Sequence, residues 1–227
     1  MEVIDATGVR SVPPFWSEVG WARPYHFLGA AGNSCPGEFV SHDYLADKIV
    51  SGFTYSKSIA RKSLTRTKAG PISGAQFSAV LRCIYQALSD ERDIVACVVT
   101  DNVEAWADAA WVVENEPRSL RQIVTQDNSH LLSRMLQGQE WAQGAGIYVL
   151  LCLDWRAVQS SGQDVNAAYA NALVKVGRIG HALLLEGQHH NLVARMTPAI
   201  HESSASALFR LSEDISPIYA IRLSEPT

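Results

Sequence analysis

The sequence of 227 residues lacks paired cysteines and long apolar runs, two features that would indicate a class of protein directly. Its four cysteines form no CxxC pair and no zinc-ligand spacing, which argues against a disulfide scaffold or a zinc module. The longest apolar run, about 147–153, is far shorter than the roughly 20 residues that a membrane span needs. We therefore expect a cytoplasmic globular protein with reduced thiols, three buried and one in a loop.

Charge is also scarce. Charged residues make up 19% of the chain, against a usual share of about 25%, which suggests that a partner subunit covers part of the surface. The net charge of −4 argues against a general nucleic-acid-binding protein. The first five residues are acidic and contain no apolar segment, so no signal peptide is expected. Neither nucleic acid nor a membrane is an expected partner.

We expect the chain to divide into an irregular arm at residues 1–40 and a single domain at residues 41–227. The arm is rich in glycine, proline and aromatic residues and is expected to pack on a neighbour. A helix is predicted from Ser73 to Leu88, because Ser73 and Gln76 have capping-box spacing before an apolar stripe. Further helices are predicted at 128–136, at 166–189 and from Ser203 or Ser204 to Leu211. Strands are predicted at 94–100, 110–113, 147–153, 192–196 and 217–223.

These helices and strands alternate without a regular βαβ rhythm, so the pattern predicts an α+β fold with one central sheet. The longest predicted helix contains Gly177 and Gly180, which weaken a helix unless another backbone or a flat ligand comes close. Asn191 follows this helix and suits a left-handed cap. His189 and His190 are adjacent and point to different faces, so no metal site is expected there.

A basic segment precedes the first confident helix. Seven cations and no acid occur between Lys48 and Ser89, and five of the cations lie between Lys57 and Lys68, interleaved with serine and threonine. Arginine forks and hydroxyl groups together suit a phosphate group, although such a run can also be a solvated positive surface.

The segment Ala60–Arg66, followed by Gly70–Ser73, resembles the opening signature of the nitroreductase-like flavoproteins. In that family an arginine-rich stretch binds the phosphate of FMN, and a turn then starts a helix. The resemblance implies FMN as the cofactor. It places four residues at the FMN phosphate: Arg61, Lys62, Ser63 and Arg66.

Other segments resemble the SagB/ThcOx branch of that family, the azoline dehydrogenases of peptide natural-product pathways. They are residues 23–26, 119–123, 139–142 and 146–155, and residues 172–181, which resemble the family's Ala-Leu-x-Glu-x-Gly central helix. The resemblance implies a nitroreductase-like fold, with a central mixed sheet flanked by helices and a long central helix at a dimer interface. The implied activity is FMN-dependent oxidation of thiazoline or oxazoline rings, with a peptide as the possible substrate. The strand exit expected to lie against the isoalloxazine comprises Arg195, Met196, Thr197, Pro198 and Ala199.

The sequence also departs from the branch. Between Leu88 and Ile94 only five residues remain, where relatives have a flavin-contacting loop. The Lys-Tyr pair expected before the central helix is replaced by Gln163 and Asp164, and of the following segment only Tyr169 is retained. Asp164 and Tyr169 are therefore the candidate catalytic residues.

Each candidate has a plain structural alternative: a helix N-cap for Asp164 and a buried helix face for Tyr169. Three functions remain open. The chain can be an active azoline dehydrogenase, a degenerate subunit that completes the flavin site of an intact paralogue, or a nitroreductase acting on small aromatics. It is accordingly expected to form a homodimer or a heteromer with a related flavoprotein subunit.

Overall fold

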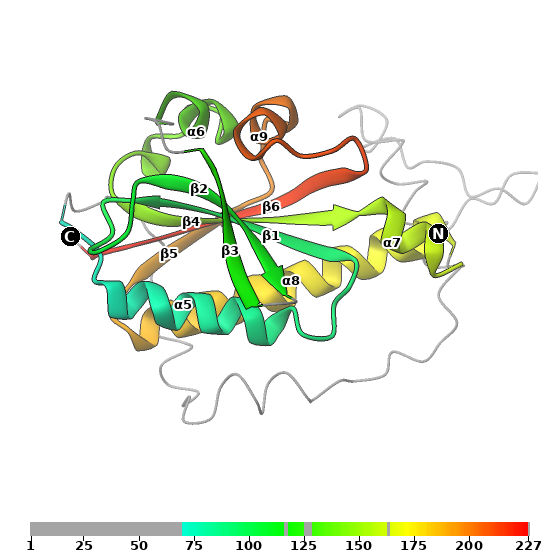
Figure 1. The fold of residues 1–227 in the computed structure, drawn as a ribbon, viewed down its shortest axis with the longest axis horizontal. Helices are drawn as coiled ribbons and strands as arrows, with labels where there is room; N and C mark the ends of the chain where they lie inside the picture. The colour runs from blue at the N-terminus through cyan, green and yellow to red at the C-terminus, as the bar shows by residue number, and fades with distance from the viewer. Residues whose placement is uncertain (1–69, 116–117, 125–128, 163, 227) are drawn as a thin grey trace, which may run out of the picture.

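The computed structural model describes residues 70–115, 118–124, 129–162 and 164–226. They form one six-stranded sheet with helices on both faces (Figure 1). The expected boundary at residue 40 lies outside this part of the chain. The same holds for the four candidate phosphate ligands Arg61, Lys62, Ser63 and Arg66.

The sheet has the strand order β3-β2-β1-β4-β6-β5. Its strands are β1 (Ile94–Asp101), β2 (Ala109–Asn115), β3 (Arg118–Val124), β4 (Gly146–Asp154), β5 (Val193–Thr197) and β6 (Ile215–Ser224). The expected α+β fold around a central sheet is confirmed. All pairs of these strands are antiparallel, whereas a mixed sheet was expected. The short β1–β2 and β2–β3 connections require antiparallel neighbours. The one parallel pairing among the described residues is an isolated bridge between Ile72 and Val103.

Two helices cover each face of the sheet. Helices α5 (Gly74–Ala87) and α8 (Val165–His189) lie on one face, and α6 (Ser129–Met135) and α9 (Glu202–Phe209) lie on the other (Figure 1). A short helix, α7 (Trp155–Ser160), continues directly from β4. Strands β1 and β4 are therefore buried on both sides, which explains why they read as continuous apolar runs in the sequence.

Local sequence signals explain where the two long helices begin. The Ser73 hydroxyl accepts a hydrogen bond from the Gln76 N–H, and the Gln76 side chain accepts one from the Ser73 N–H, as the capping box predicts. Asp164 caps α8 by accepting from the N–H groups of Asn166 and Ala167. After α8, Asn191 has the predicted left-handed backbone, with φ of 60°.

Three of the cysteines are buried, as expected, and Cys35 lies outside the described residues. Cys83 lies in the core between the sheet and the α5–α8 layer, where burial, with a smaller contribution from the Glu186 charge, raises its pKa to about 12. Cys97 and Cys152 lie in the opposite core. A hydrogen bond to Cys97 and burial raise the pKa of Cys152. These thiols are structural rather than reactive.

Other elements differ from the predictions. Helix α9 is capped by His201 instead of Ser203 or Ser204, because the His201 N–H donates to the Met135 carbonyl of α6 and fixes the start of the helix there. Strand β3 and helix α7 were not predicted as elements. In the part of the chain that the structure describes, no helix has both the length and the apolar character needed to cross a membrane.

Candidate functional site

The exit of strand β5 packs closely on the middle of α8. A Cβ atom placed on Gly180 would lie 3.1 Å from the sulfur of Met196 and 3.5 Å from a methyl carbon of Ile221. Glycine at this position therefore lets the helix approach strands β5 and β6. One of the two unfavourable mid-helix glycines is explained by packing within the chain.

The five candidate residues at this exit do not share one face of the sheet. Met196 packs in the core under α8, whereas the Arg195 guanidinium lies over the Trp141 ring, 5.0 Å from its centroid. Thr197 is buried, and its hydroxyl accepts a hydrogen bond from the Ala199 N–H at 3.0 Å. Pro198 is exposed. Successive strand residues point to opposite faces, so Arg195 and Met196 cannot both contact one flat ligand on the same side.

These residues fit one side of a flavin ring. Met196 and the half-buried Tyr219 provide an apolar surface beside Gly180, at a sheet edge where α8 crosses β5 and β6. Residues 198 and 199 offer a ligand no free main-chain donor. The Ala199 N–H donates to the Thr197 hydroxyl, and Pro198 has no N–H. The described residues thus suit the apolar face of an isoalloxazine, while the predicted phosphate ligands lie in residues 61–66.

Strand β6 continues past the end of β5. Strand β5 pairs with residues 220–224 only, and the last pair joins Thr197 to Ala220. Residues 215–219 of β6 pair with β4 on one side and with no strand on the other among the described residues. Pro217 lies in this stretch and suits an edge strand, because it has no N–H to donate. In the part of the chain that the structure describes, the β5 exit is therefore bordered by an unpaired stretch of β6.

The two candidate catalytic residues lie towards the N-terminus of α8. Tyr169 is half-buried, and its ring stacks on Trp155 with a centroid separation of 6.1 Å and an interplanar angle of 16°. Asp164 is exposed, and its carboxylate caps the helix. At about 1.5 Å per residue, Tyr169 lies roughly 16 Å and Asp164 roughly 24 Å along the helix axis from Gly180. The structure does not bring them next to Met196.

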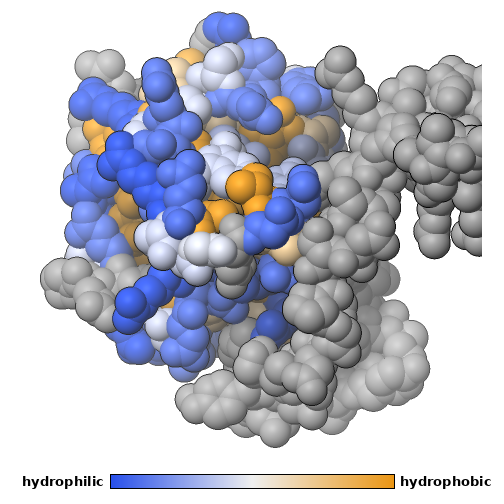
Figure 2. All heavy atoms as spheres, turned by 90° about the vertical axis from the view of Figure 1, so that its right-hand side faces the viewer, coloured by the Kyte–Doolittle hydropathy of each residue, from blue (hydrophilic) through white to orange (hydrophobic). Residues whose placement is uncertain are grey.

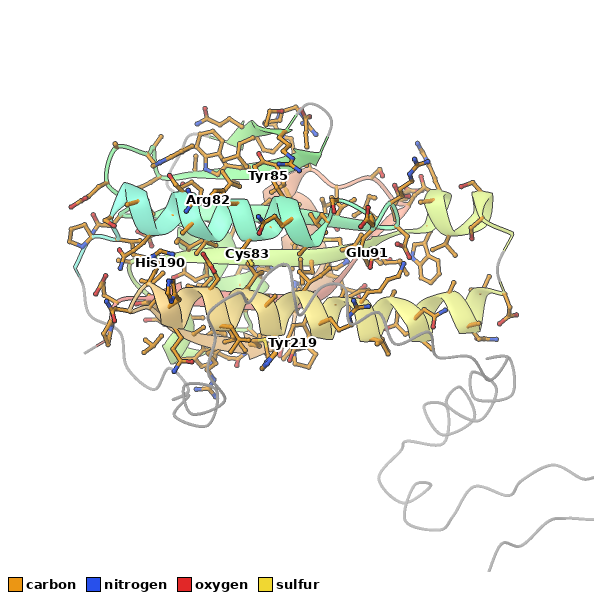
Figure 3. The ribbon with its side chains drawn as sticks, turned by 90° about the horizontal axis from the view of Figure 1, so that it is seen from below. Arg82, Cys83, Tyr85, Glu91, His190 and Tyr219 are labelled. Atoms are coloured by element: carbon orange, nitrogen blue, oxygen red, sulfur yellow. The ribbon has the colours of Figure 1, made fainter. Side chains whose placement is uncertain are left out.

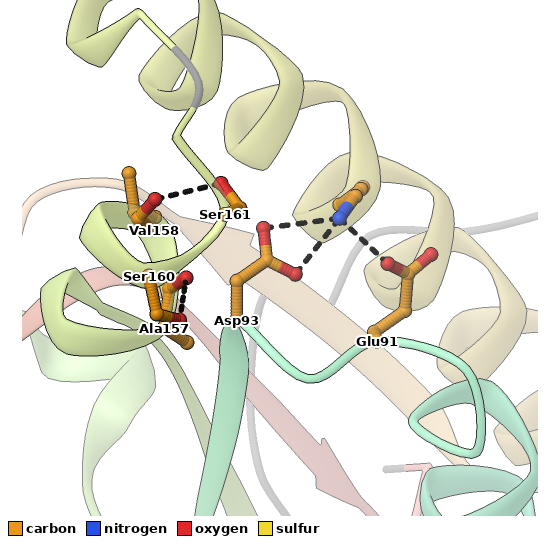
Figure 4. Close-up of polar contacts among 7 residues, drawn as sticks. Glu91, Asp93, Ala157, Val158, Ser160 and Ser161 are labelled. Carbon is orange, nitrogen blue, oxygen red and sulfur yellow. Dashed lines mark hydrogen bonds and ion pairs between the residues drawn. The ribbon is translucent and has the colours of Figure 1, made fainter.

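A half-buried ion cluster joins α8 to the short segment before β1, and sequence reasoning missed it. Lys175 Nζ lies 2.8 Å from Glu91 Oε2, and 2.8 and 3.0 Å from the two carboxylate oxygens of Asp93 (Figure 4). Burial alone would lower the pKa of Lys175, but the hydrogen bonds to Asp93 and Glu91 outweigh it and raise that pKa. Lys175 therefore stays charged at neutral pH and cannot serve as a general base.

A signal for this cluster was present in the sequence. Lys175 stands where the similar central helix of the nitroreductase-like branch has glutamate, and both partner carboxylates come from the shortened segment at residues 89–93. The lysine that replaces the glutamate and the two carboxylates of the shortened segment therefore form one ion cluster. Lys175 is also the only lysine in residues 70–227, so the described part of the chain has no free lysine to offer.

On the other face of the sheet, Arg222 is fully buried. Its guanidinium donates to the carbonyl oxygens of Trp141, Gly144 and Ala145, and it lies over the Tyr148 ring. Burial lowers the pKa of Arg222. Three carbonyls held by one side chain fix the turn before β4, so we interpret Arg222 as a structural residue.

The adjacent histidines form no metal site in the described part of the chain. Their rings meet edge to face, with centroids 5.1 Å apart, and His190 Nε2 lies 3.2 Å from Glu186 Oε1. Across the described residues, no group of three or more histidine, cysteine, aspartate or glutamate side chains has the arrangement of a metal site.

Comparison with solved structures identifies the type of fold. Neither a family model nor a curated protein matches the sequence. Among solved structures, a protein assigned as a nitroreductase from Anabaena variabilis matches with a TM-score of 0.68 and 17% identity, over 76% of this chain. The chain has a nitroreductase-like fold. It spans 38% of the length of that protein.

Two further structures have the same fold. The NADPH:FMN oxidoreductase from Vibrio harveyi, in complex with NAD+, matches with a TM-score of 0.55 and 15% identity, over 75% of this chain and 67% of that chain. A chain of the E. coli microcin synthetase McbBCD complex with truncated pro-MccB17 bound matches with a TM-score of 0.57 and 13% identity. That match covers 95% of both chains.

Proposed function

We propose that this chain is an FMN-dependent oxidoreductase subunit that takes part in oxidising thiazoline or oxazoline rings of a peptide in the cytoplasm. The observation that carries the proposal is the match to a microcin synthetase chain over 95% of both chains, which agrees with the resemblance seen in the sequence. The flavoprotein character is supported by the likeness to an FMN oxidoreductase.

In this proposal, each part of the chain has a separate task. FMN, when bound, would accept the hydride. Arg61, Ser63 and Arg66 would bind its phosphate. Met196 would support the ring near Gly180, where α8 packs closely on β5. Tyr169 and Asp164 lie roughly 16 and 24 Å along α8 from Gly180, so neither would reach a ring bound at Met196 of the same chain. Removal of the ring proton still needs a base, and in this proposal these two residues are candidates only for a ring that a partner subunit places near the start of α8.

The second candidate function is a non-catalytic subunit that completes the flavin site of an intact paralogue. A specific observation favours it: the one lysine of residues 70–227 is held by two carboxylates, so it cannot replace the missing lysine base. Asp164 already accepts two main-chain hydrogen bonds as a helix cap. In this alternative, the chain supplies side chains that line the flavin site, and its partner supplies the catalytic base.

The absorbance spectrum of the purified protein, alone and co-expressed with a related flavoprotein subunit, separates these functions. Flavin bound to the lone protein supports the first. Flavin present only in the mixed complex, at more than the partner alone retains, supports the second. Protein that binds no flavin in either state contradicts both.

A substitution tests the phosphate assignment within the same samples. Arg61→Ala is expected to release the flavin, because it removes a paired donor to the phosphate. Arg134→Ala is the matched control, since Arg134 is exposed on α6, on the face of the sheet away from α8 and Met196. Unchanged flavin occupancy in Arg61→Ala would show that the basic segment is only a charged surface.

A further inference from the structure

Strand β6 contains a stretch that lies beside β4 but beside no second strand in the part of the chain that the structure describes. The stretch comprises residues 215–219, which we call the β6 edge. Strand β5 ends at the pair Thr197–Ala220, so the β6 edge begins where β5 leaves the sheet. An unpaired strand edge presents main-chain N–H and C=O groups that an extended peptide can bind as an added strand.

One face of the β6 edge is continuous with the surface proposed for the flavin ring. Tyr219 and Met196 both pack towards Gly180 in the middle of α8, and Figure 3 shows Tyr219 beside this helix. At the other end of the edge, the Ser216 hydroxyl accepts a hydrogen bond from Trp155 Nε1 at 2.8 Å. Trp155 packs against the same core as Met196 and Tyr219. The β6 edge therefore connects the surface at Met196 with Trp155.

The stack of Trp155 and Tyr169 lies at the far end of the β6 edge. Both rings are half-buried, so part of the stack remains accessible. Five residues of an extended strand span roughly 17 Å, and Tyr169 lies roughly 16 Å along α8 from Gly180. A peptide strand that continued the line of β5 along the β6 edge would therefore reach from Met196 to the stack.

The charges at this end of the molecule are mainly negative. The start of β6 pairs with the end of β4, next to α7, and Figure 2 faces this end, where small apolar patches lie between hydrophilic side chains. The charged side chains that flank the starts of β6 and α8 are the carboxylates of Asp154, Asp164, Glu213 and Asp214 and the guanidinium groups of Arg156 and Arg210. A peptide with lysine residues beside its strand fits this end better than an acidic one.

We propose that the β6 edge binds the peptide substrate as an added strand, with one heterocycle at Met196 and the neighbouring side chains over the Trp155–Tyr169 stack. The proposal rests on the proposed function for the identity of the occupant, a peptide that carries azoline rings. Tyr169 would contact the peptide and not the reacting ring. Main-chain hydrogen bonds depend little on side chains, so a peptide with several rings could bind in successive registers.

The test measures peptide binding without flavin or turnover, so this proposal and the proposed function can fail separately. Peptide bound at the β6 edge of a chain that takes up no flavin, alone or with a partner, would contradict the proposed function alone. Flavin binding and turnover without peptide at the β6 edge would contradict the docking proposal alone.

The probe is an acetylated and amidated octapeptide of alternating threonine and valine, with a lysine at each end and photo-leucine in place of the central valine. Illumination attaches it to the full chain where it binds, and digestion with trypsin locates the attachment. The β6 edge lies in the tryptic fragment 211–222, whereas strand β3 at the opposite end of the sheet lies in fragments 119–121 and 122–134. We expect the main label in 211–222 and none in the β3 fragments.

Two N-methylated forms of the octapeptide test strand addition itself. Alternate residues of a strand direct their N–H groups to opposite sides, so one alternate set faces β6 and the other faces away. Methylating the facing set should weaken binding roughly tenfold, because about two hydrogen bonds are lost. Methylating the other set should change the affinity less than about threefold. Fluorescence anisotropy of a labelled peptide gives the dissociation constants.

Substitutions in the chain test the aromatic stack. Tyr169→Ala should weaken peptide binding about fivefold, and Tyr169→Phe should preserve it, because phenylalanine keeps the ring. Tyr85→Ala is the matched control, since Tyr85 is a half-buried tyrosine on α5, apart from Tyr219 in Figure 3. Replacing both lysines of the peptide by glutamate should weaken binding at about 0.05 M NaCl, and the difference should shrink at about 0.5 M.

Four results would overturn the proposal. The first is label confined to fragments other than 211–222. The second is equal affinity of the two N-methylated peptides, because side-chain contacts and not an added strand would then hold the peptide. The third is label in 211–222 that disappears as the protein concentration rises, which would identify a second copy of this chain as the occupant of the β6 edge. The fourth is an equal loss in Tyr169→Ala and Tyr85→Ala, which would remove the stack from the binding surface.

Discussion

Lys175 on α8 donates hydrogen bonds to both carboxylate oxygens of Asp93, the residue immediately before β1, at 2.8 and 3.0 Å. This contact spans 82 positions of the sequence and joins the longest helix to the start of the central sheet. The shortened segment at residues 89–93 is therefore attached to α8 by an ion pair.

Replacing Lys175 by methionine should lower the free energy of unfolding by about 1–3 kcal/mol. The substitution leaves the carboxylates of Glu91 and Asp93, 13% and 20% exposed, close together without a cation. Urea unfolding followed by circular dichroism measures the loss. Arg156→Met is the control, because that arginine is 74% exposed in its pair with Asp214 and should cost less than about 0.5 kcal/mol. Equal losses in the two variants would contradict the prediction.

The same cluster predicts a dependence on alkaline pH. The pKa of Lys175 is raised in the folded protein, so its stabilising effect is complete below the unfolded pKa of about 10.4 and disappears as pH rises through the folded pKa. The difference in unfolding free energy between the unaltered protein and Lys175→Met should therefore be constant near neutral pH and should shrink above about pH 10.5. Urea unfolding at several pH values tests this. A difference that begins to shrink below about pH 9 would mean that Lys175 is not the titrating group.

Arg222→Met should lower the free energy of unfolding by about 3–5 kcal/mol, because three carbonyl oxygens would lose their donor in a buried site. Arg222→Lys keeps the charge but cannot reach three carbonyls at once, so we expect an intermediate loss. Thermal and urea unfolding give both values. A loss below about 1 kcal/mol in the methionine variant would show that the turn before β4 is held by other contacts.

The glycines of α8 form a matched series. Gly177→Ala should stabilise the isolated chain by up to about 1 kcal/mol, since alanine favours helix and the added methyl group meets open space. Gly180→Ala should gain less or lose stability, because its methyl group presses on Met196. Gly187→Ala should be the most destabilising, because its methyl group overlaps Leu223. Unfolding midpoints in urea rank the three variants, and any other order would contradict the packing of α8 on the sheet.

Substitutions of the candidate catalytic residues should have small effects on turnover if this subunit supplies no base. Asp164→Asn keeps an N-cap side chain and removes the carboxylate, and Tyr169→Phe keeps the stack on Trp155. We expect turnover of the assembled complex to fall less than about fivefold in each variant. Loss of a general base would instead cost roughly 10²–10⁴-fold. Such a loss, with flavin and assembly intact, would identify this chain as catalytic.

Local signals predicted much of the fold. The capping box at Ser73, the apolar stripe of α8 and the left-handed cap at Asn191 each depend on residues close in sequence, so the sequence alone was sufficient. The apolar runs of β1 and β4 were visible because both of their faces are buried. Strand β3 lies at the sheet edge, and the polar residues Arg121 and Gln122 interrupt its apolar alternation, so it was not recognised.

The candidate site was less predictable, because its geometry depends on distant contacts. The start of α9 at His201 is set by a carbonyl of α6, and no pattern around Ser203 indicates that contact. The resemblance grouped Arg195 with Met196, but strand alternation sends them to opposite faces of the sheet. The partner of Lys175 could not be inferred from spacing, since it lies on another element.

The buried cysteines make opening of the folded sheet measurable without an added label. Cys97 and Cys152 lie on neighbouring strands under α6 and α9, and Cys83 lies on α5, in the core on the other side of the sheet. A thiol-specific reagent can reach them only when the protein opens locally or unfolds. With Cys35 replaced by serine, the rates at which the three thiols react would report separately how often each layer leaves the sheet.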